Sequence, residues 1–593
     1  MELPPGPRFL LRLLPAIVIP CVTVVGLLRL IEIETGTSVP IWAFALGVLA
    51  IHPALFIFRR AYSRYAEARA AAASNAFMPP HVVEQWPYYG GLTIMRTLVN
   101  DLKNGYPGDG FLRWMEEYGP TYQLRMLSDN RLLTAEPEHI KQILATQFDS
   151  YEKGPATNDQ FGSLLGTGVF NSDGEMWKFH RSMTRPFFTK DRISHFDMFD
   201  SHAENALSQA KIRIQDGYPI DFQDLVSRFT LDSATQFLFG HDVESLSAGL
   251  PYPESSPLAN SLAFRNHPSN VFVDAFLKGQ DLTALRGRMG PTWPLAEFWG
   301  DKVKPLRKTM DKFTEPVLVE ALRKRNLNPD AKMDDDDDST LLSHLIQHTQ
   351  DVTVLKDELL NLLVAGRDTT ACTLTFALYM LCEHPKIAER LYKEIIDVVG
   401  PTDRPTYENI RDMKYLRAFL NEVLRLYPAV PFDSRTSNKP TVLDTKTPGS
   451  VPIYVPANTK VIYAIMLMHR RKDLWGPDAL EFDPDRFLDQ RLHKYLTPNP
   501  FIFSPFNAGP RICLGQQFAY QESSFFLVRL LQQFRNFRMA PDAQPEWSKP
   551  PAHWAAEGGR KAIEKVVPGT HLTMYARGGL WVRMDEQKSE LSG

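Results

Sequence analysis

One cysteine lies in a loop whose composition suits metal ligation. The stretch FNAGPRICLG, Phe506 to Gly515, surrounds Cys513 with two glycines, an arginine and a proline. The chain has 593 residues and only four cysteines, too few for a disulfide framework and typical of a reducing compartment. The Cys513 thiol is then either a reactive or metal-binding thiolate or a packed small hydrophobic group, which is the commoner case.

A polar island interrupts an apolar helical stretch. The segment Asp357 to Leu381 is apolar on nearly every side except at Arg367, Asp368, Thr369 and Thr370. A buried carboxylate needs partners or a function, and the threonine hydroxyls can bond to carbonyls of the preceding turn. The island is therefore either a solvent-facing patch on a core helix or a polar site inside the protein.

Three further fragments carry charge at suggestive spacing. Glu422 and Arg425 stand three apart on an amphipathic helix, where an ion pair alone contributes only a few tenths of a kcal/mol. Arg486 lies in the proline-bounded stretch FDPDRF, and WKFHR places Trp177 and Arg181 four apart on one helical face. Each fragment alone is more often scaffold than chemistry.

The N-terminus contains two apolar runs. Ile41 to Phe58 has no formal charge, and as a helix it would reach ~27 Å, close to the hydrocarbon thickness of a bilayer. Leu13 to Leu28 is shorter and contains two prolines, so it either spans, inserts partway or lies in the interface. Arginines flank the pair, which predicts cytosolic flanks. A cleaved signal peptide or a core helix are the alternatives to an anchor of one or two transmembrane helices over residues 1–62.

The rest of the chain is read as one large body. An alanine-rich stretch closed by two prolines predicts a linker over residues 63–86, followed by a catalytic domain over 87–584 and a short tail over 585–593. The acidic run MDDDDDST at 333–340 is expected to be a solvated loop, because adjacent carboxylates repel one another.

The predicted fold class is mostly α with small β-sheets. Helical periodicity dominates the middle and the C-terminal half, whereas strand-like runs are few and bounded by Pro and Gly, as at 451–465 and 569–584. With 66 basic and 69 acidic residues, the charge gives no reason to expect a nucleic-acid partner.

The motifs together resemble one family. Phe506-x-x-Gly509-x-Arg511-x-Cys513-x-Gly515 resembles the haem-ligand loop of the cytochrome P450 family. The other fragments follow in that family's order. Its oxygen-activation helix is similar to Ala365-Gly366-x-Asp368-Thr369-Thr370, and the helix that follows is similar to HPKIAERLYKEI. Its ExxR helix is similar to Glu422-x-x-Arg425, and its PERF-type loop to Pro484-Asp485-Arg486-Phe487, with Asp for the usual Glu. The resemblance covers roughly Pro87 to Met584.

The resemblance implies a haem b cofactor with Cys513 as the axial thiolate ligand of iron. A thiolate pushes electron density onto haem iron and favours O–O cleavage. Gly509 and Gly515 would let the backbone approach the porphyrin, and Phe506 would shield the sulfur from water. Helix formers after Gly515 predict a helix N-terminus that stabilises the thiolate.

Further roles follow from motif position. Guanidinium groups match the carboxylates of haem propionates, so Arg181, Arg435 and Arg511 are the candidate propionate ligands, with Trp177 as a donor. The resemblance also implies a buried ion network that fixes the cysteine loop, formed by Glu422, Arg425 and Arg486.

Asp368 and Thr369 would deliver protons during oxygen activation. Their presence favours monooxygenation over the two alternatives within the enzyme class, a haem-thiolate isomerase and a peroxygenase. A non-catalytic haem-binding protein is the alternative from another class, because it would keep Cys513 without turnover.

Partners follow from what the chain lacks and from the resemblance. The sequence shows no glycine-rich phosphate loop after a strand and no cysteine cluster, so electrons must come from elsewhere. The resemblance implies NADPH-cytochrome P450 reductase, with cytochrome b5 as a further donor, and an endoplasmic reticulum membrane with a cytosolic catalytic domain.

The chain is most similar to fungal membrane-bound hydroxylases of alkanes and fatty acids, which implies a lipophilic substrate. We expect Val430, Pro431 and Phe432 to line its pocket and residues 240–300 to form the access channel.

Overall fold

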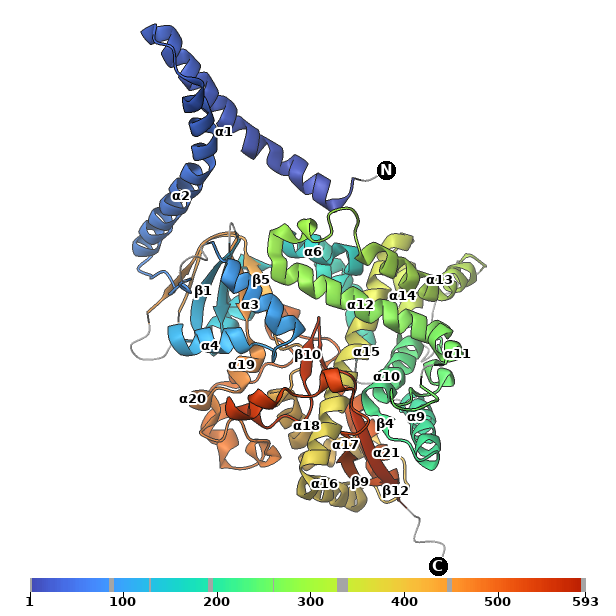
Figure 1. The fold of residues 1–593 in the computed structure, drawn as a ribbon. Coiled ribbons are helices and arrows are strands. Elements are labelled where there is room, and N and C mark those ends of the chain that lie inside the picture. The colour runs from blue at the N-terminus through green and yellow to red at the C-terminus, as the bar shows by residue number, and fades with distance from the viewer. Residues whose placement is uncertain are drawn as a thin grey trace, which may run out of the picture.

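Two long N-terminal helices project from a mostly helical body (Figure 1). The computed structural model describes residues 3–84, 90–126, 129–189, 196–259, 261–327, 340–444 and 451–587. The acidic run expected to be a solvated loop lies, except for its last residue, outside these ranges.

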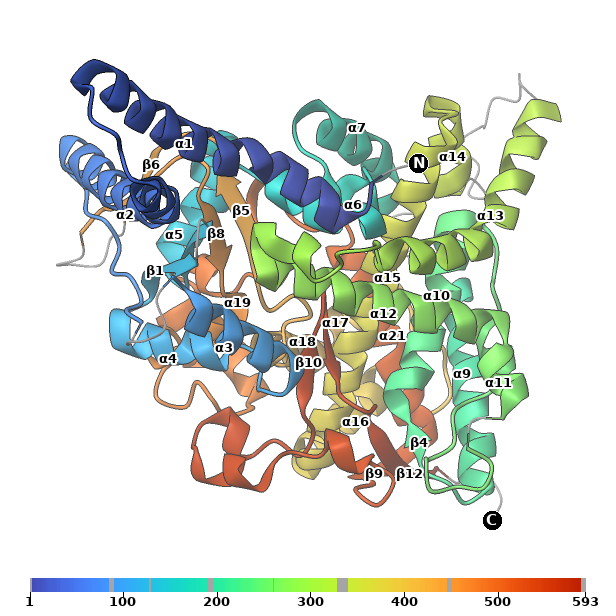
Figure 2. The same ribbon diagram turned by 45° about the horizontal axis from the view of Figure 1, so that its top comes forward.

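Both apolar N-terminal runs form continuous helices, α1 (Pro5–Thr35) and α2 (Ile41–Ala73). The two prolines inside α1 do not end it, and each helix is long and apolar enough to cross a membrane. The start of α1 returns to the body, where the Gly6 amide donates to the Phe298 carbonyl at 3.0 Å. The hairpin stands on the side of the body that carries the sheet of β5 and β8 and the end of α12 (Figure 2). The structure therefore offers two candidate membrane spans.

Helices make up most of the body, as predicted. Those of its first half are α3 (Leu92–Lys103), α4 (Asp109–Tyr118), α5 (Pro137–Lys141), α6 (Pro155–Leu165), α7 (Gly174–Thr184), α9 (Asp197–Gln215), α10 (Phe222–Phe239), α11 (Leu262–Asn266), α12 (Pro268–Met289), α13 (Val303–Leu327) and α14 (Leu341–His348). Those of its second half are α15 (Val352–Glu383), α16 (Pro385–Val398), α17 (Tyr407–Asp412), α18 (Lys414–Leu426), α19 (Ile465–His469), α20 (Lys472–Trp475) and α21 (Gln516–Gln533).

Helix α15 passes through the middle of the body and packs against α10, α18 and α21. Its N-terminus is capped by the Asp351 carboxylate, which accepts from the Thr353 amide at 2.8 Å. Nearly all of its side chains from Leu355 onward are buried, as expected for a helix that is apolar on almost every side. The polar island of the sequence thus lies in the core, not on a solvent-facing patch.

Within the described residues the strands form four small sheets. They are β1 (Thr121–Met126), β2 (Asp129–Thr134), β3 (Tyr151–Glu152), β4 (Ile220–Asp221), β5 (Asp433–Ser437), β6 (Thr441–Leu443), β7 (Ile453–Val455), β8 (Lys460–Tyr463), β9 (Phe534–Met539), β10 (Pro568–Thr570), β11 (Met574–Ala576) and β12 (Trp581–Glu586). The largest sheet has the order β1-β2-β8-β5-β3, with β2 and β8 parallel. Both strand-like runs of the sequence contain strands, so that prediction is confirmed.

The stretch between the anchor and the body is bonded to the sheets. Helix α2 continues to Ala73, and the Phe77 amide donates to the Pro452 carbonyl at 2.8 Å. The Val82 amide then donates to Gln123 of β1 at 3.0 Å. These bonds fix where the projecting helices leave the body.

Candidate functional site

A cavity of about 440 Å³ lies between the centre of α15 and the loop that contains Cys513. Helices α6, α7, α10 and α12, strands β2, β5 and β8, and the loop between β10 and β11 also contribute to its wall. Eight of the predicted site residues line it: Trp177, Arg181, Thr369, Arg435, Phe506, Arg511, Cys513 and Gly515. Of the three residues expected to line a substrate pocket, Val430 and Phe432 do so.

The cysteine loop is held by close backbone contacts. The Cys513 amide donates to the Phe506 carbonyl at 2.9 Å, and α21 begins three residues after the cysteine. Gly509 has a φ of +66°, and a Cβ there would lie 2.0 Å from the Leu144 carbonyl oxygen. The glycine is therefore required by an approach to the neighbouring backbone of residues 142–146, and the predicted approach to a porphyrin stays a prediction.

The Cys513 thiol faces the cavity, so it is accessible although protein surrounds it. Burial raises the pKa of this thiol, and the Gly515 amide and the Arg181 guanidinium oppose that rise. At Gly515 a Cβ would meet Phe188 at 3.6 Å and Cys513 Sγ at 3.9 Å, which are ordinary contacts. Packing within the protein thus leaves room beside the sulfur.

Three arginines surround the cavity side of this loop. Arg181 Nη1 donates to the Ile512 carbonyl, next to the cysteine, at 2.7 Å. Arg511 Nη2 bonds Asp173 at 2.7 Å, and its guanidinium lies 4.5 Å from the centroid of the Trp177 ring. Arg435 Nη1 pairs with Asp433 at 3.0 Å, which raises the pKa of the guanidinium. The four residues predicted to hold a cofactor carboxylate therefore gather in one place.

The hydrogen-bond donors of the three arginines and Trp177 fit a dianionic cofactor. Buried Arg511 Nε has no hydrogen-bond partner among the described residues. Lys153 lines the cavity beside Arg435, and burial together with the Arg435 charge lowers its pKa to about 8. A wall with an orphaned guanidinium nitrogen and a destabilised ammonium favours carboxylate groups. A haem with two propionates meets this requirement.

The polar residues at the centre of α15 lie partly at the cavity wall and partly in the core. Thr369 lines the cavity, and its Oγ1 donates to the Ala365 carbonyl at 2.7 Å, which confirms the predicted bond to the preceding turn. Asp368 is buried and does not line the cavity; it bonds Arg367 at 2.5 Å and Gln280 of α12 at 2.6 Å. The carboxylate has the partners that its burial demands.

Glu422 and Arg425 form a fully buried ion pair. Arg425 Nε and Nη2 bond the two oxygens of Glu422 at 2.7 and 2.8 Å. Arg486 Nε lies 3.5 Å from Glu422, although the shorter bonds of Arg486 run to Asp478. The predicted network of three residues is thus present, with Asp478 as an additional member.

His469 connects this network to the cysteine loop. Its Nδ1 lies 3.2 Å from the Arg425 carbonyl, and its Nε2 accepts from the Ser504 amide at 3.1 Å. Burial and the Arg425 charge lower the pKa of His469 to about 3, so the ring is neutral and can accept. Sequence reasoning missed this residue because nothing in its local pattern marks it; only its place after β8 brings it to Ser504.

The loop between β10 and β11 was also missed. His571, Leu572 and Thr573 line the cavity, and burial lowers the pKa of His571 to about 4. The sequence predicted strands here but gave no sign that their turn reaches α15. The pairing of Pro568 with Ala576 fixes that turn.

The fold and the cavity match what is expected of a haem-thiolate oxygenase, and comparison with known proteins identifies the family. A model of the cytochrome P450 family matches residues 85–553. Among curated relatives, the cytochrome P450 monooxygenase g430 of Fusarium sp is 34% identical over 513 residues, 85% of this chain and 86% of the relative. Cytochrome P450 monooxygenase himC of Aspergillus japonicus is 37% identical over 460 residues (76% and 75%), and cytochrome P450 52A3-A of Candida maltosa is 36% identical over 427 residues (70% and 77%).

The chain belongs to the cytochrome P450 family and is a monooxygenase. Membership implies a haem with a cysteine thiolate ligand, a redox partner and a lipophilic substrate. Helices α1 and α2 associate it with a membrane. The family prediction and the predicted fold class are confirmed.

Proposed function

We propose that Cys513 ligates the iron of haem b and that the enzyme inserts one oxygen atom of O₂ into a fatty acid, an alkane or a similar hydrophobic compound. The observation that carries this proposal is that Cys513 and Thr369, from two distant parts of the chain, line one cavity whose remaining wall is largely apolar. A haem with a thiolate ligand supplies oxygen activation when bound.

The chain's own residues would hold the cofactor at two places. Arg181, Arg435 and Arg511, with Trp177 beside them, would bind the propionates, which explains the orphaned Arg511 nitrogen. Phe506, which packs against Tyr520 at 5.3 Å between ring centroids, would limit water at the Cys513 sulfur.

Glu422, Arg425 and Arg486 would act as scaffold. Their network reaches the cysteine loop through His469 and Ser504, so it would fix the height of the Cys513 sulfur in the cavity. None of the three lines the cavity.

Thr369 would hold a proton donor at the cavity wall, since its hydroxyl both lines the cavity and bonds within α15. Asp368 would relay protons toward it, since each of its carboxylate oxygens accepts one bond, from Gln280 and from Arg367, and keeps further acceptor capacity.

Electrons would come from NADPH-cytochrome P450 reductase, with cytochrome b5 as a further donor, at an endoplasmic reticulum membrane with the catalytic domain in the cytosol. Residues 1–62 would be the anchor, 63–86 the linker, 87–584 the catalytic domain and 585–593 a tail. The apolar helices α1 and α2 and the apolar cavity support a substrate that partitions into the bilayer.

The test uses full-length protein reconstituted in lipid vesicles with the reductase. We expect fatty acids or alkanes to be hydroxylated only when both NADPH and O₂ are present. Product formed from peroxide alone, or an isomerised product without O₂ consumption, would contradict the proposal. The protein boiled before addition of NADPH controls for uncatalysed oxidation.

A further inference from the structure

A second group of cations lines the cavity besides the arginines at the cysteine loop. Arg131 is in β2, Lys460 lies next to it in the parallel register with β8, and Arg288 is in the last turn of α12. Arg131 Nη2 reaches the Arg288 carbonyl at 3.5 Å.

The charges of this second group are not balanced. Asp129 pairs with Arg131, whose Nε and Nη2 both lie 2.7 Å from its carboxylate. Neither the Arg288 guanidinium nor Lys460 Nζ has a hydrogen bond or ion pair with the residues that the structure describes. Burial and the Arg131 charge lower the pKa of Lys460 to about 7 and that of Arg288 to about 10. Three cations thus lie at the cavity wall near two carboxylates, Asp129 and Asp433, and the remaining positive charge favours the binding of an anion.

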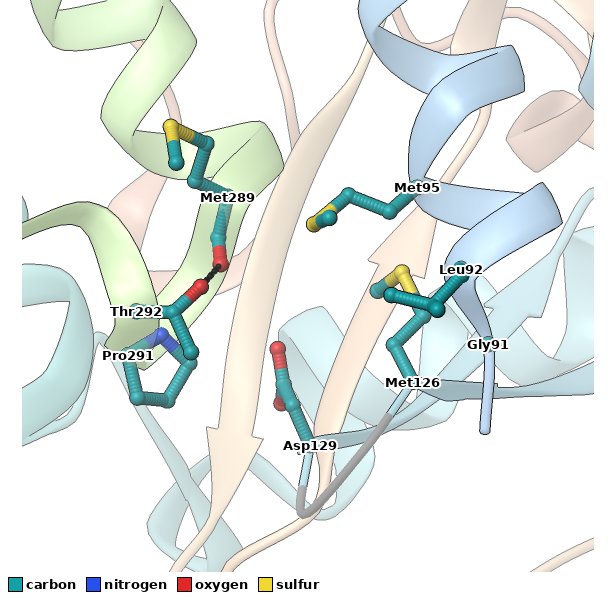
Figure 3. Close-up of a pocket in the computed structure, with 8 residues that line it drawn as sticks. All are labelled: Gly91, Leu92, Met95, Met126, Asp129, Met289, Pro291 and Thr292. Carbon is teal, nitrogen blue, oxygen red and sulfur yellow. Dashed lines mark hydrogen bonds between the residues drawn. The ribbon is translucent and has the colours of Figure 1, made fainter. Parts of the chain in front are cut away.

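An apolar recess borders this group where the β1–β2 hairpin meets the end of α12. Met95 and Met126 extend into it from one side and Met289 and Pro291 from the other, with the Asp129 carboxylate between them (Figure 3). Because Asp129 is also the partner of Arg131, the recess and the cations adjoin.

We propose that Arg131, Arg288 and Lys460 bind the carboxylate of a long-chain substrate whose alkyl chain extends along the cavity toward Cys513. The inference rests on the proposed function and selects, among the hydrophobic substrates considered there, the anionic ones. Guanidinium groups bind carboxylates in a bidentate fashion, while a neutral alkane would leave the cations unpaired. The carbon that reaches the Cys513 end is then remote from the acid group.

The experiment compares three ligands of equal chain length: palmitic acid, hexadecanol and hexadecane. Their dissociation constants are measured from the spectral shift of the haem in full-length protein, and their KM values in vesicles with the reductase. In K460Q and R288Q we expect the affinity for palmitic acid to fall about tenfold each, as for the loss of a charge-assisted hydrogen bond. The affinity for hexadecanol and hexadecane stays within about twofold.

Two further variants guard against a general loss of structure. K460R keeps the charge and retains the affinity for palmitic acid. K278Q removes an exposed lysine of α12 that pairs with Asp274, and changes none of the three affinities. Both variants keep the wild-type spectrum of the reduced, carbon-monoxide-bound form.

Three results for K460Q and R288Q would overturn the inference. The affinities for palmitic acid and hexadecanol could fall equally, the affinity for palmitic acid could stay unchanged, or the variants could lose haem. The last outcome would assign these cations to the haem propionates. Wild-type protein that binds and oxidises hexadecane and palmitic acid equally well would refute the inference and leave the proposed function intact. Wild-type protein with haem that binds none of the three ligands would refute both.

Discussion

Neutralising Glu422 should destabilise the protein strongly because its partner stays buried. Both Glu422 and Arg425 have 0% of their side chains exposed, and they share two bonds of 2.7 and 2.8 Å. In Glu422→Gln the Arg425 guanidinium loses its only charged partner of opposite sign within bonding distance among the described residues. Breaking one side of a buried ion pair costs about 3–5 kcal/mol. We expect a loss of that size in the free energy of unfolding.

The chain offers a matched control at almost the same distance. Arg390 and Asp485 form an ion pair of 2.8 Å whose side chains are 50% and 39% exposed. Because water screens such a pair, Asp485→Asn should cost less than about 1 kcal/mol. Urea denaturation followed by haem absorption measures both variants.

The double variant Glu422→Gln/Arg425→Gln completes a thermodynamic cycle. It should cost less than the sum of the two single variants, because no uncompensated charge remains in the core. Equal costs for Glu422→Gln and Asp485→Asn, or strict additivity in the cycle, would refute the reasoning that burial sets the energy.

Three other predictions concern proton delivery, acid stability and the anchor. Thr369→Ala should divert reducing equivalents to peroxide, while Thr375→Ala, which alters a buried threonine of the same helix outside the cavity, should not. The amount of product formed per NADPH consumed measures this diversion. An unchanged ratio in Thr369→Ala would contradict the prediction. His469 has a pKa of about 3 in the folded state and about 6.5 in the unfolded state, so the unfolded state binds the proton first as pH falls. The free energy of unfolding should therefore decrease by up to ~1.4 kcal/mol per pH unit between about pH 6.5 and pH 3. His469→Gln should flatten that part of the urea-midpoint profile; an unchanged slope contradicts it. Deleting residues 1–62 should move the protein to the soluble fraction with its haem spectrum intact, and full membrane retention contradicts the anchor.

The order of the motifs predicted the family and many residues of the cavity wall, because each motif lies within one short stretch of sequence. The sequence placed Trp177 and Arg181 on one helical face, and both line the cavity from α7. It also placed Glu422 and Arg425 one turn apart, and they are paired. Spacing along a helix translates directly into a shared face.

Residues that meet through sheet pairing could not be predicted in this way. Arg131 and Lys460 become neighbours only because β2 and β8 pair in parallel, and their segments are far apart in the chain. His469, at the end of α19, reaches Ser504 through packing between a helix and a loop, which local sequence does not reveal either. Nothing in either local pattern distinguishes these side chains from surface charges or a core histidine.

Gly509 and Asp368 show that a motif can identify a residue without revealing what that residue contacts. The glycine is required by the Leu144 carbonyl, and the aspartate faces Gln280 within the core. Family position identified both residues, but only the packing around them shows what each one contacts.

The absorption spectrum of the reduced, carbon-monoxide-bound protein tests directly whether Cys513 ligates a haem. We predict the red-shifted band of thiolate-ligated haem in the wild type and in Cys372→Ala, which removes a buried cysteine of α15 away from the cavity. Cys513→Ala should lack that band. The same thiolate spectrum in Cys513→Ala, or no haem in the wild type, would contradict the account.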